Sequence, residues 1–278
     1  LDLHNFISIF WHMLYGSDKH SIKLDIKPTK HIHRGIMTTI SKDTAKRLIK
    51  DIKAITKTPP KGIFYVHDES NILAGKALII GPPDSPYEGG YYFFKFAFPE
   101  NYPHSPPKVT YCTNDGKTRM HPNLYKNGKV CLSLLNTWDG DAWTGCNTIT
   151  SILLVIRSIM TKEPLSHEPG IDERHRDFFK YQEIVRYKNI QLAMFNVFKN
   201  AYYENEFGDL FDIAKSDFVE NLESKKEIID KSLKSWNESN VEANANRVVY
   251  TSIYSMAIQI DYIPLSDMLL DTAKQLTK

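Results

Sequence analysis

Four short β-rich runs follow one another in the first half of the chain, and every helical pattern lies before or after them. The runs cover residues 63–66, 72–80, 91–98 and 108–112. Their connections are short and rich in turn residues, as in Gly81-Pro82-Pro83, which is typical of an antiparallel meander. Strands that are grouped in this way and then followed by helices predict an α+β fold.

The third run is the most aromatic of the four. One set of alternate positions holds Tyr92, Phe94, Phe96 and Phe98, and the other holds Tyr91, Phe93, Lys95 and Ala97. Alternate residues of a strand point to opposite faces of its sheet. We therefore expect one aromatic face to pack on a helix.

Apolar residues at helical spacing mark the segments on either side of the runs. One helix is expected from Ser41, a good N-cap, to the Pro59-Pro60 pair. Later helices are expected at residues 149–160, 181–198 and 211–236, from Val249 onward, and from Pro264 onward. Residues 237–246 are polar and predict an exposed loop. The expected division is an N-terminal extension of unknown role (1–40), a core (41–171) and a helical C-terminal extension (172–278).

Composition excludes several classes of protein. The 278 residues include 35 basic and 33 acidic side chains, with 42% hydrophobic residues, which is typical of a globular protein. No apolar run reaches the ~18 residues that a membrane span needs, and no basic block is dense enough for a nucleic-acid arm. We expect neither a membrane nor a nucleic-acid partner. The first residue is Leu1, so we expect the natural N-terminus to lie upstream.

The chain has three cysteines, Cys112, Cys131 and Cys146, which cannot all pair with one another. None lies in a C-x-x-C arrangement, so a disulfide framework and a structural zinc site are not expected. A metal role for His31 and His33 lacks a third ligand at suitable spacing. Free thiols fit the cytoplasm or the nucleus, and one of them can be chemically active.

The densest chemical signal is His121-Pro122-Asn123, followed by Asn127-Gly128 and then by Cys131. An Asn-Gly pair between short extended segments predicts a type I′ turn, which would bring Asn123 near Cys131. When a nucleophile attacks a thioester, negative charge develops on the carbonyl oxygen. A side-chain amide beside the thiol can stabilise that charge as an oxyanion hole does.

These motifs, in this order, resemble the ubiquitin-conjugating enzymes, the UBC-fold family, over roughly residues 41–200. Beside the His-Pro-Asn motif and Cys131, the matching pieces are the basic first helix, the segment 81–90, Phe98-Pro99, Tyr102-Pro103, Pro106-Pro107 and Trp143. The chain beyond residue 172 resembles the extension of the large members, of the Apollon/BRUCE type and of the dual-specificity type that accepts more than one modifier. The resemblance implies a UBC-like catalytic core and a cysteine-dependent transferase that needs no resident cofactor or metal.

The resemblance also implies catalytic roles. Cys131 would accept the carboxyl terminus of ubiquitin or of a ubiquitin-like protein from an activating enzyme, and a substrate lysine would then displace it. Asn123 would stabilise the oxyanion or support the loop, and His121 would be structural. Glu168, with His167 beside it, is the candidate that orients and deprotonates the lysine; a solvated loop carboxylate is the alternative reading.

Binding surfaces follow from the same resemblance. Lys46, Arg47 and Lys50 would face the activating enzyme, and Leu154 and Ser158 would hold the donor ubiquitin. A ubiquitin ligase would use two loops, which carry Tyr102, Pro103 and His104 in one and Trp143 to Cys146 in the other. His104 and Gly145 stand where many relatives have an apolar aromatic residue and a proline, which weakens the expectation of ordinary RING ligases. The stretch 112–120 is longer than the minimal family pattern.

Two rivals remain open. One is an inactive UBC-fold scaffold that only binds ubiquitin, although such variants lack the cysteine. The other is a thiol hydrolase that pairs Cys131 with His104, His121 or His167, for which no spacing in the sequence gives support. We expect Cys112 to be a buried small side chain in a strand. Cys146 at a helix start is a weak second candidate for the nucleophile.

Overall fold

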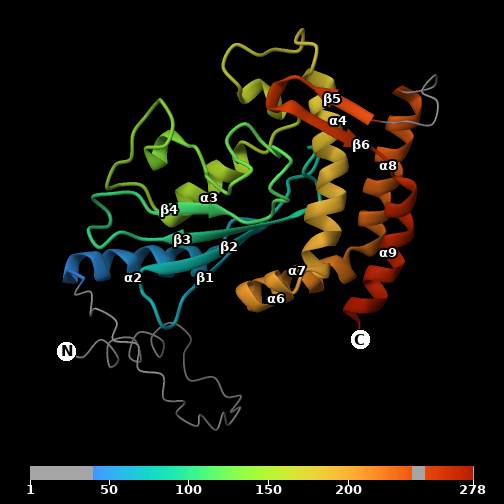
Figure 1. Ribbon diagram of the computed structural model, residues 1–278. Coiled ribbons are helices and arrows are strands. Elements are labelled where there is room, and N and C mark those ends of the chain that lie inside the picture. The colour runs from blue at the N-terminus through green and yellow to red at the C-terminus, as the bar shows by residue number, and fades with distance from the viewer. Residues whose placement is uncertain (1–39, 240–247, 278) are drawn as a thin grey trace.

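The computed structural model describes residues 40–239 and 248–277. A four-stranded antiparallel sheet lies at the centre, with helices on both sides of it (Figure 1). The expectations for residues 1–39, which include His31 and His33, and for residues 240–246 of the predicted loop lie outside the described residues. No described helix has the length and apolarity needed to cross a membrane.

The first described helix, α2 (Lys42–Lys57), begins and ends where the sequence predicts. The hydroxyl of Ser41 accepts a hydrogen bond from the amide of Thr44 and caps the helix. A proline pair follows the helix two residues after its end. Leu48, Ile52 and Ile55 are buried on its inner side, because they lie three to four residues apart on one face.

The sheet is the predicted meander. Its strands are β1 (Ile63–His67), β2 (Ala74–Ile80), β3 (Tyr91–Ala97) and β4 (Lys108–Tyr111), hydrogen-bonded in chain order. The expectation of one packed aromatic face is incomplete, because both faces of β3 are buried. Tyr92, Phe94 and Phe96 belong to the core shared with α2, whereas Tyr91 and Phe93 belong to a second core shared with the C-terminal helices.

An irregular segment follows β4 and carries the chemistry predicted from the sequence. It contains one short turn of 3₁₀-helix, η1 (Ser133–Leu135), and leads into α3 (Ile149–Ser158). Thr148 and Ser151 form a reciprocal capping box at the start of α3. A second 3₁₀ turn, η2 (Pro164–His167), then places Glu168 directly after it.

The C-terminal part is mainly helical and packs along one side of the sheet (Figure 1). It begins as one winding stretch of α4 (Phe178–Lys188), a π-helical segment η3 (Asn189–Asn196) and α5 (Val197–Lys199). The helices α6 (Ala201–Phe207), α7 (Asp209–Glu220) and α8 (Leu222–Ser239) follow, where the sequence predicts one helix over residues 211–236. The last helix, α9 (Ile263–Leu276), has Pro264 in its first turn, as predicted.

The helix expected from Val249 onward is wrong. The chain forms a β-hairpin there, with β5 (Val248–Thr251) and β6 (Met256–Gln259) paired antiparallel. Its turn contains η4 (Ile253–Ser255), in which Tyr254 and Ser255 have φ values of +59° and +49°. Met256 and Ile260 are buried and Val249 and Ile253 are partly buried, although the chain there is a β-hairpin. The spacing alone therefore does not decide between the two structures.

Candidate functional site

The loop from His121 to Cys131 folds back on itself, as predicted. The amide of Cys131 donates to the carbonyl of Asn123 at 2.9 Å, and the amide of Tyr125 donates to the carbonyl of Lys129 at 2.9 Å. The turn is not type I′, because only Gly128 (φ +85°) has a positive φ and Asn127 does not. It is a four-residue turn, closed by the amide of Gly128 donating to the carbonyl of Tyr125, and the left-handed glycine is its last residue. This turn achieves the same reversal.

Asn123 and Cys131 are in direct contact through this loop. The side-chain Nδ2 of Asn123 donates to the backbone carbonyl of Cys131 at 2.7 Å. In this conformation the amide supports the loop, and its second N–H remains available for another acceptor. The Cys131 residue is only 1% exposed, so the surrounding loops shield its thiol from solvent in this conformation.

His121 is a fully buried, neutral side chain. Its Nδ1 accepts the amide N–H of Asn123 at 3.0 Å, which fixes the ring against the loop. Burial, followed by the nearby ring of His167, lowers the pKa of His121 well below its ordinary value. Among the described residues no imidazole hydrogen-bonds to the Cys131 thiol, so the structure offers no support for the hydrolase rival.

His167 and Glu168 lie next to this buried histidine. The rings of His121 and His167 are 5.0 Å apart, and His167 Nε2 is 3.2 Å from the hydroxyl of Thr161. Glu168 is partly exposed, and its Oε2 accepts a hydrogen bond of 2.5 Å from the hydroxyl of Tyr254. Sequence reasoning did not find Tyr254, because the helix expected there hid the hairpin turn that carries it.

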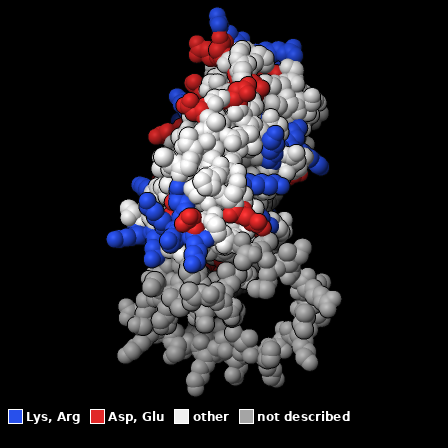
Figure 2. Space-filling model, turned by 90° about the vertical axis from the view of Figure 1, so that its left-hand side faces the viewer, with Lys and Arg blue, Asp and Glu red and all other residues white. Residues whose placement is uncertain are grey.

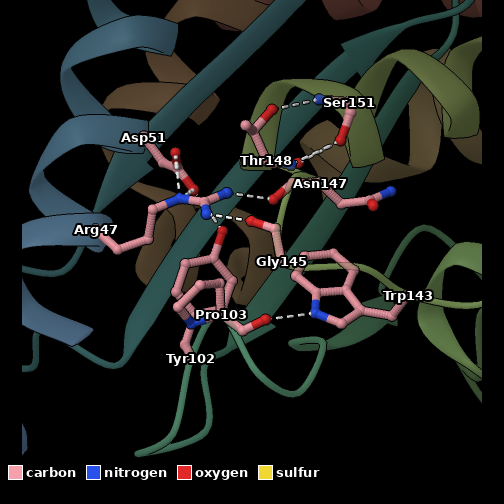
Figure 3. A network of polar contacts seen from close by, with 9 residues as sticks. All are labelled: Arg47, Asp51, Tyr102, Pro103, Trp143, Gly145, Asn147, Thr148 and Ser151. Atoms are coloured by element: carbon pink, nitrogen blue, oxygen red, sulfur yellow. Dashed lines mark hydrogen bonds and ion pairs between the residues drawn. The ribbon is translucent and has the colours of Figure 1, made fainter. Parts of the chain in front are cut away.

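The two loops predicted to bind a ligase are joined to each other. The indole N–H of Trp143 donates to the carbonyl of Pro103 at 2.7 Å, and the rings of Trp143 and Tyr102 are 5.9 Å apart (Figure 3). His104 and Gly145 are both exposed at this end of the molecule. The loops therefore form one continuous surface, whose ligase-binding role stays a prediction.

Arg47 does not extend into solvent with the other basic residues of α2. Its guanidinium donates to Asp51 and to the carbonyls of Gly145 and Asn147, and the hydroxyl of Tyr102 donates to Asp51 at 2.5 Å (Figure 3). These contacts fasten α2 to the loop before α3. Sequence spacing could not reveal this, because Arg47 and Asn147 are 100 positions apart.

Lys46 and Lys50 are exposed on α2, together with Lys42 and Lys53. Figure 2 shows basic side chains gathered low on this face, where α2 begins, with an uncharged area above them. On α3, Ile149, Ile152, Leu153 and Ile156 form the buried stripe. Leu154 is 46% exposed and Ser158 is exposed, so both lie off that stripe as the sequence indicates.

The other two cysteines differ in environment. Cys112 follows β4 and is half-buried, and burial raises the pKa of its thiol. Cys146 is exposed two residues before the N-cap of α3. Within residues 40–239 and 248–277, no group of three or more histidine, cysteine, aspartate or glutamate side chains could hold a metal ion.

Residues 47–191 match the family model described as ubiquitin-conjugating enzyme. The chain is 46% identical over 151 residues to the human ubiquitin-conjugating enzyme E2 Z, a match that covers 53% of this chain and 43% of the relative. The Xenopus tropicalis protein of the same name is 45% identical, with 53% and 48% covered.

A more distant relative is the probable ubiquitin-conjugating enzyme E2 R521 of Acanthamoeba polyphaga mimivirus. It is 34% identical over 177 residues, which cover 58% of this chain and 12% of the viral protein. The chain spans about half the length of the E2 Z relatives that it matches. The family model covers Asn123, Cys131 and Glu168, whereas Tyr254 and the hairpin lie beyond it.

Proposed function

The chain belongs to the ubiquitin-conjugating enzyme family, and from this premise we propose that it carries a modifier protein as a thioester on Cys131. The modifier is ubiquitin or a ubiquitin-like protein, received from an activating enzyme and passed to a lysine amine of a protein substrate. The contact between the Asn123 amide and the Cys131 backbone carries this proposal, because it places an amide N–H donor beside the only cysteine in the folded-back loop.

The reaction proceeds in two acyl transfers. In the first, the Cys131 thiolate attacks the thioester carbonyl on the activating enzyme, a new C–S bond forms and the activating enzyme's thiolate leaves. In the second, the lysine nitrogen attacks the carbonyl on Cys131, a C–N bond forms and the C–S bond breaks. The amide of Asn123 either donates its second N–H to the developing oxyanion or holds the loop that positions Sγ.

Glu168 is proposed to orient the incoming amine and to receive its proton. A lysine with a pKa of ~10.4 is almost wholly protonated near neutral pH, so its nitrogen must lose a proton in order to attack. A carboxylate within hydrogen-bond reach can accept that proton as the C–N bond forms. His121 is neutral and held by the loop, which supports a structural role for it. The thiolate leaving group needs no general acid.

Partner surfaces complete the proposal. Lys46 and Lys50 offer exposed positive charge to an activating enzyme. Arg47 has a structural role instead, because its hydrogen bond to the carbonyl of Gly145 holds α2 against that loop. The joined loops around Pro103 and Trp143 are the surface for a ligase. The exposed Leu154 and Ser158 face the donor modifier. Three free thiols fit action in the cytoplasm or the nucleus.

The test is a charging assay with magnesium, ATP, ubiquitin or another modifier, and each available activating enzyme. Samples of the wild type, Cys131→Ala and the matched control Cys146→Ala are run on gels with and without reductant. We expect a reductant-sensitive adduct in the wild type and in the control, and none in Cys131→Ala. Cys131→Ser should give an adduct that resists reductant, because an oxyester replaces the thioester.

An adduct that survives in Cys131→Ala, or disappears in Cys146→Ala, would place the nucleophile elsewhere. Absence of any adduct, together with measurable ubiquitin binding, would favour the inactive scaffold instead. Charging restricted to ubiquitin would exclude the second modifier that the dual-specificity resemblance suggests.

A further inference from the structure

The hairpin of the C-terminal extension reaches the rim of the candidate site. The carbonyl of Tyr254, in its turn, accepts a hydrogen bond from Lys126 Nζ at 3.1 Å, and Lys126 lies in the loop between Asn123 and Cys131. The sulfur of Met256 lies 3.4 Å from the amide of Arg119, just before the His-Pro-Asn motif. The extension is therefore attached to both sides of the motif.

The turn is held in place from a third direction by Asp177, the residue before α4. Its Oδ2 accepts the amide and the hydroxyl of Ser252, at 2.8 and 2.5 Å, and the amide of Ile253 at 3.0 Å. Burial alone would raise the pKa of Asp177, but these hydrogen bonds outweigh it and lower the pKa below its usual range. The carboxylate thus works as an anchor for the hairpin.

The backbone of the turn is unusual at the residue that touches Glu168. Tyr254 and Ser255 both have positive φ, a region that side chains other than glycine seldom occupy. Such conformations persist where surrounding contacts determine them, and they concentrate at functional sites. Here the conformation lets the Tyr254 ring lie 5.7 Å from the Tyr181 ring and 4.9 Å from the guanidinium carbon of Arg119.

The contact between Tyr254 and Glu168 is asymmetric. The phenol donates to Oε2 only, at 2.5 Å, and the other oxygen, Oε1, accepts no hydrogen bond from any of the residues that the structure describes. Burial, followed by the hydrogen bond to Glu168 and its charge, raises the pKa of Tyr254, so the phenol stays a donor at neutral pH. One oxygen is fixed and the other is left for an incoming group.

We propose that Tyr254 is a positioning residue for Glu168, so that the C-terminal extension takes part in transfer to lysine but not in charging of Cys131. This inference rests on the role proposed above for Glu168. A carboxylate that is free to rotate spends part of its time turned away from the amine. A single short hydrogen bond from a rigid turn restricts it to one orientation.

The test is a single-turnover discharge assay on the full chain. Cys131 is charged with ubiquitin, ATP is removed, and loss of the thioester is followed with free lysine or with hydroxylamine, whose nitrogen is already neutral near pH 7. Tyr254→Phe removes one oxygen atom, and Tyr250→Phe on the same hairpin, 65% exposed, is the matched control. Glu168→Gln and the double variant complete the set.

We expect the thioester of Tyr254→Phe to be discharged to lysine about 10-fold more slowly than that of the wild type. This loss is smaller than the ~100-fold or more that a positioned base contributes, because Glu168 is still present but less well oriented. Its charging rate and its discharge to hydroxylamine should stay within about 2-fold of the wild type, because neither needs Glu168 to take a proton. The double variant Glu168→Gln with Tyr254→Phe should discharge to lysine no more slowly than Glu168→Gln alone. Asp177→Ala, which releases the turn without touching the pair, should slow lysine discharge in the same selective way.

Each contrary result has a distinct meaning. Normal lysine discharge by Glu168→Gln would overturn the role of Glu168, and the inference with it, while leaving transfer through Cys131 intact. If Glu168→Gln is slow but Tyr254→Phe is normal, only the inference fails. Equal slowing with lysine and hydroxylamine would also overturn it, since general damage to the site would then explain the loss.

Discussion

At the scale of single residues, the core holds a histidine whose two ring nitrogens are both engaged. His67 Nδ1 lies 2.8 Å from the hydroxyl of Tyr65, and its Nε2 lies 2.9 Å from the carbonyl of Ile72. A neutral ring with its proton on Nε2 satisfies both partners, because the phenol can donate to Nδ1. Burial lowers the pKa of His67 to about 4.

This environment predicts a loss of stability in mild acid. Below the unfolded-state pKa of ~6.5 the unfolded chain binds a proton at His67 that the folded chain does not take up until about pH 4. This contribution of His67 to the free energy of unfolding is complete above pH 7 and falls as the pH drops from 7 to 4, by roughly 3 kcal/mol in all. Urea unfolding at pH 7 and at pH 5 should show a smaller drop for His67→Gln than for the wild type. Equal drops would mean that His67 titrates alike in both states.

At the scale of elements, the glycine pair before β3 forms a close junction between the core and the extension. A Cβ at Gly90 would lie 2.0 Å from Oδ1 of Asn189 and 2.9 Å from Cβ of Ala193, both in η3. Asn189 is buried there, accepts the hydroxyl of Tyr92 at 2.5 Å and donates to the carbonyl of Glu88 at 2.9 Å. The absence of a side chain at Gly90 lets η3 approach the strand closely enough for these bonds.

Gly90→Ala should therefore lower the free energy of unfolding by about 1–3 kcal/mol, because η3 must move and the bond between Asn189 and Tyr92 must lengthen. Gly145→Ala is the matched control, since the nearest atom to a Cβ there is 4.0 Å away and its φ is not positive. Chemical denaturation of both variants provides the measurement. Equal stabilities of the two variants would contradict this, because η3 would then accommodate the added methyl group with no change in the free energy of unfolding.

At the scale of the whole molecule, the sheet is shared between the core and the extension. Leu78, Tyr91 and Phe93 face the helices α6–α9 and form one apolar cluster with them. Beside them Lys225 of α8 is 4% exposed, and its Nζ contacts Asp217 at 3.0 Å and the carbonyl of Gly89 at 3.1 Å. The predicted boundary at residue 172 stays a prediction from the sequence. In the structure, residues before and after this boundary pack together in one apolar cluster.

This shared packing predicts one cooperative unfolding transition. Trp143 lies in the core and Trp236 in α8, and both are buried. Variants that keep only one of the four tryptophans should lose fluorescence and far-ultraviolet circular dichroism at the same urea concentration, whichever tryptophan remains. An earlier transition at Trp236 than at Trp143 would show that the extension unfolds on its own.

Local sequence signals predicted much of this molecule. The meander, the capped α2, the reversal at Asn127-Gly128 and the pairing of Asn123 with Cys131 all depend on residues close in sequence, where periodicity and turn chemistry apply. The family resemblance named the two loops as ligase-binding surfaces, but the contact of Trp143 with Pro103 was not predicted. The internal role of Arg47 followed from neither, because its partners depend on tertiary packing.

The C-terminal hairpin shows where such reasoning stops. Val249, Ile253, Met256 and Ile260 recur at helical spacing, yet two of them lie in paired strands and one in the turn. Short apolar patterns are compatible with either structure, and β-branched residues favour the ribbon. Without the hairpin, neither Tyr254 nor its contact with Glu168 could be inferred.

The helices that cover the second face of the sheet also compete with any separate protein that could bind to that face. Because they belong to the same chain, they meet that face at an effective concentration on the order of millimolar. A separate protein at micromolar concentration would compete for it at a roughly thousandfold disadvantage. We therefore expect separate proteins to meet the chain at other surfaces, such as the exposed residues of α2, the joined loops and α3.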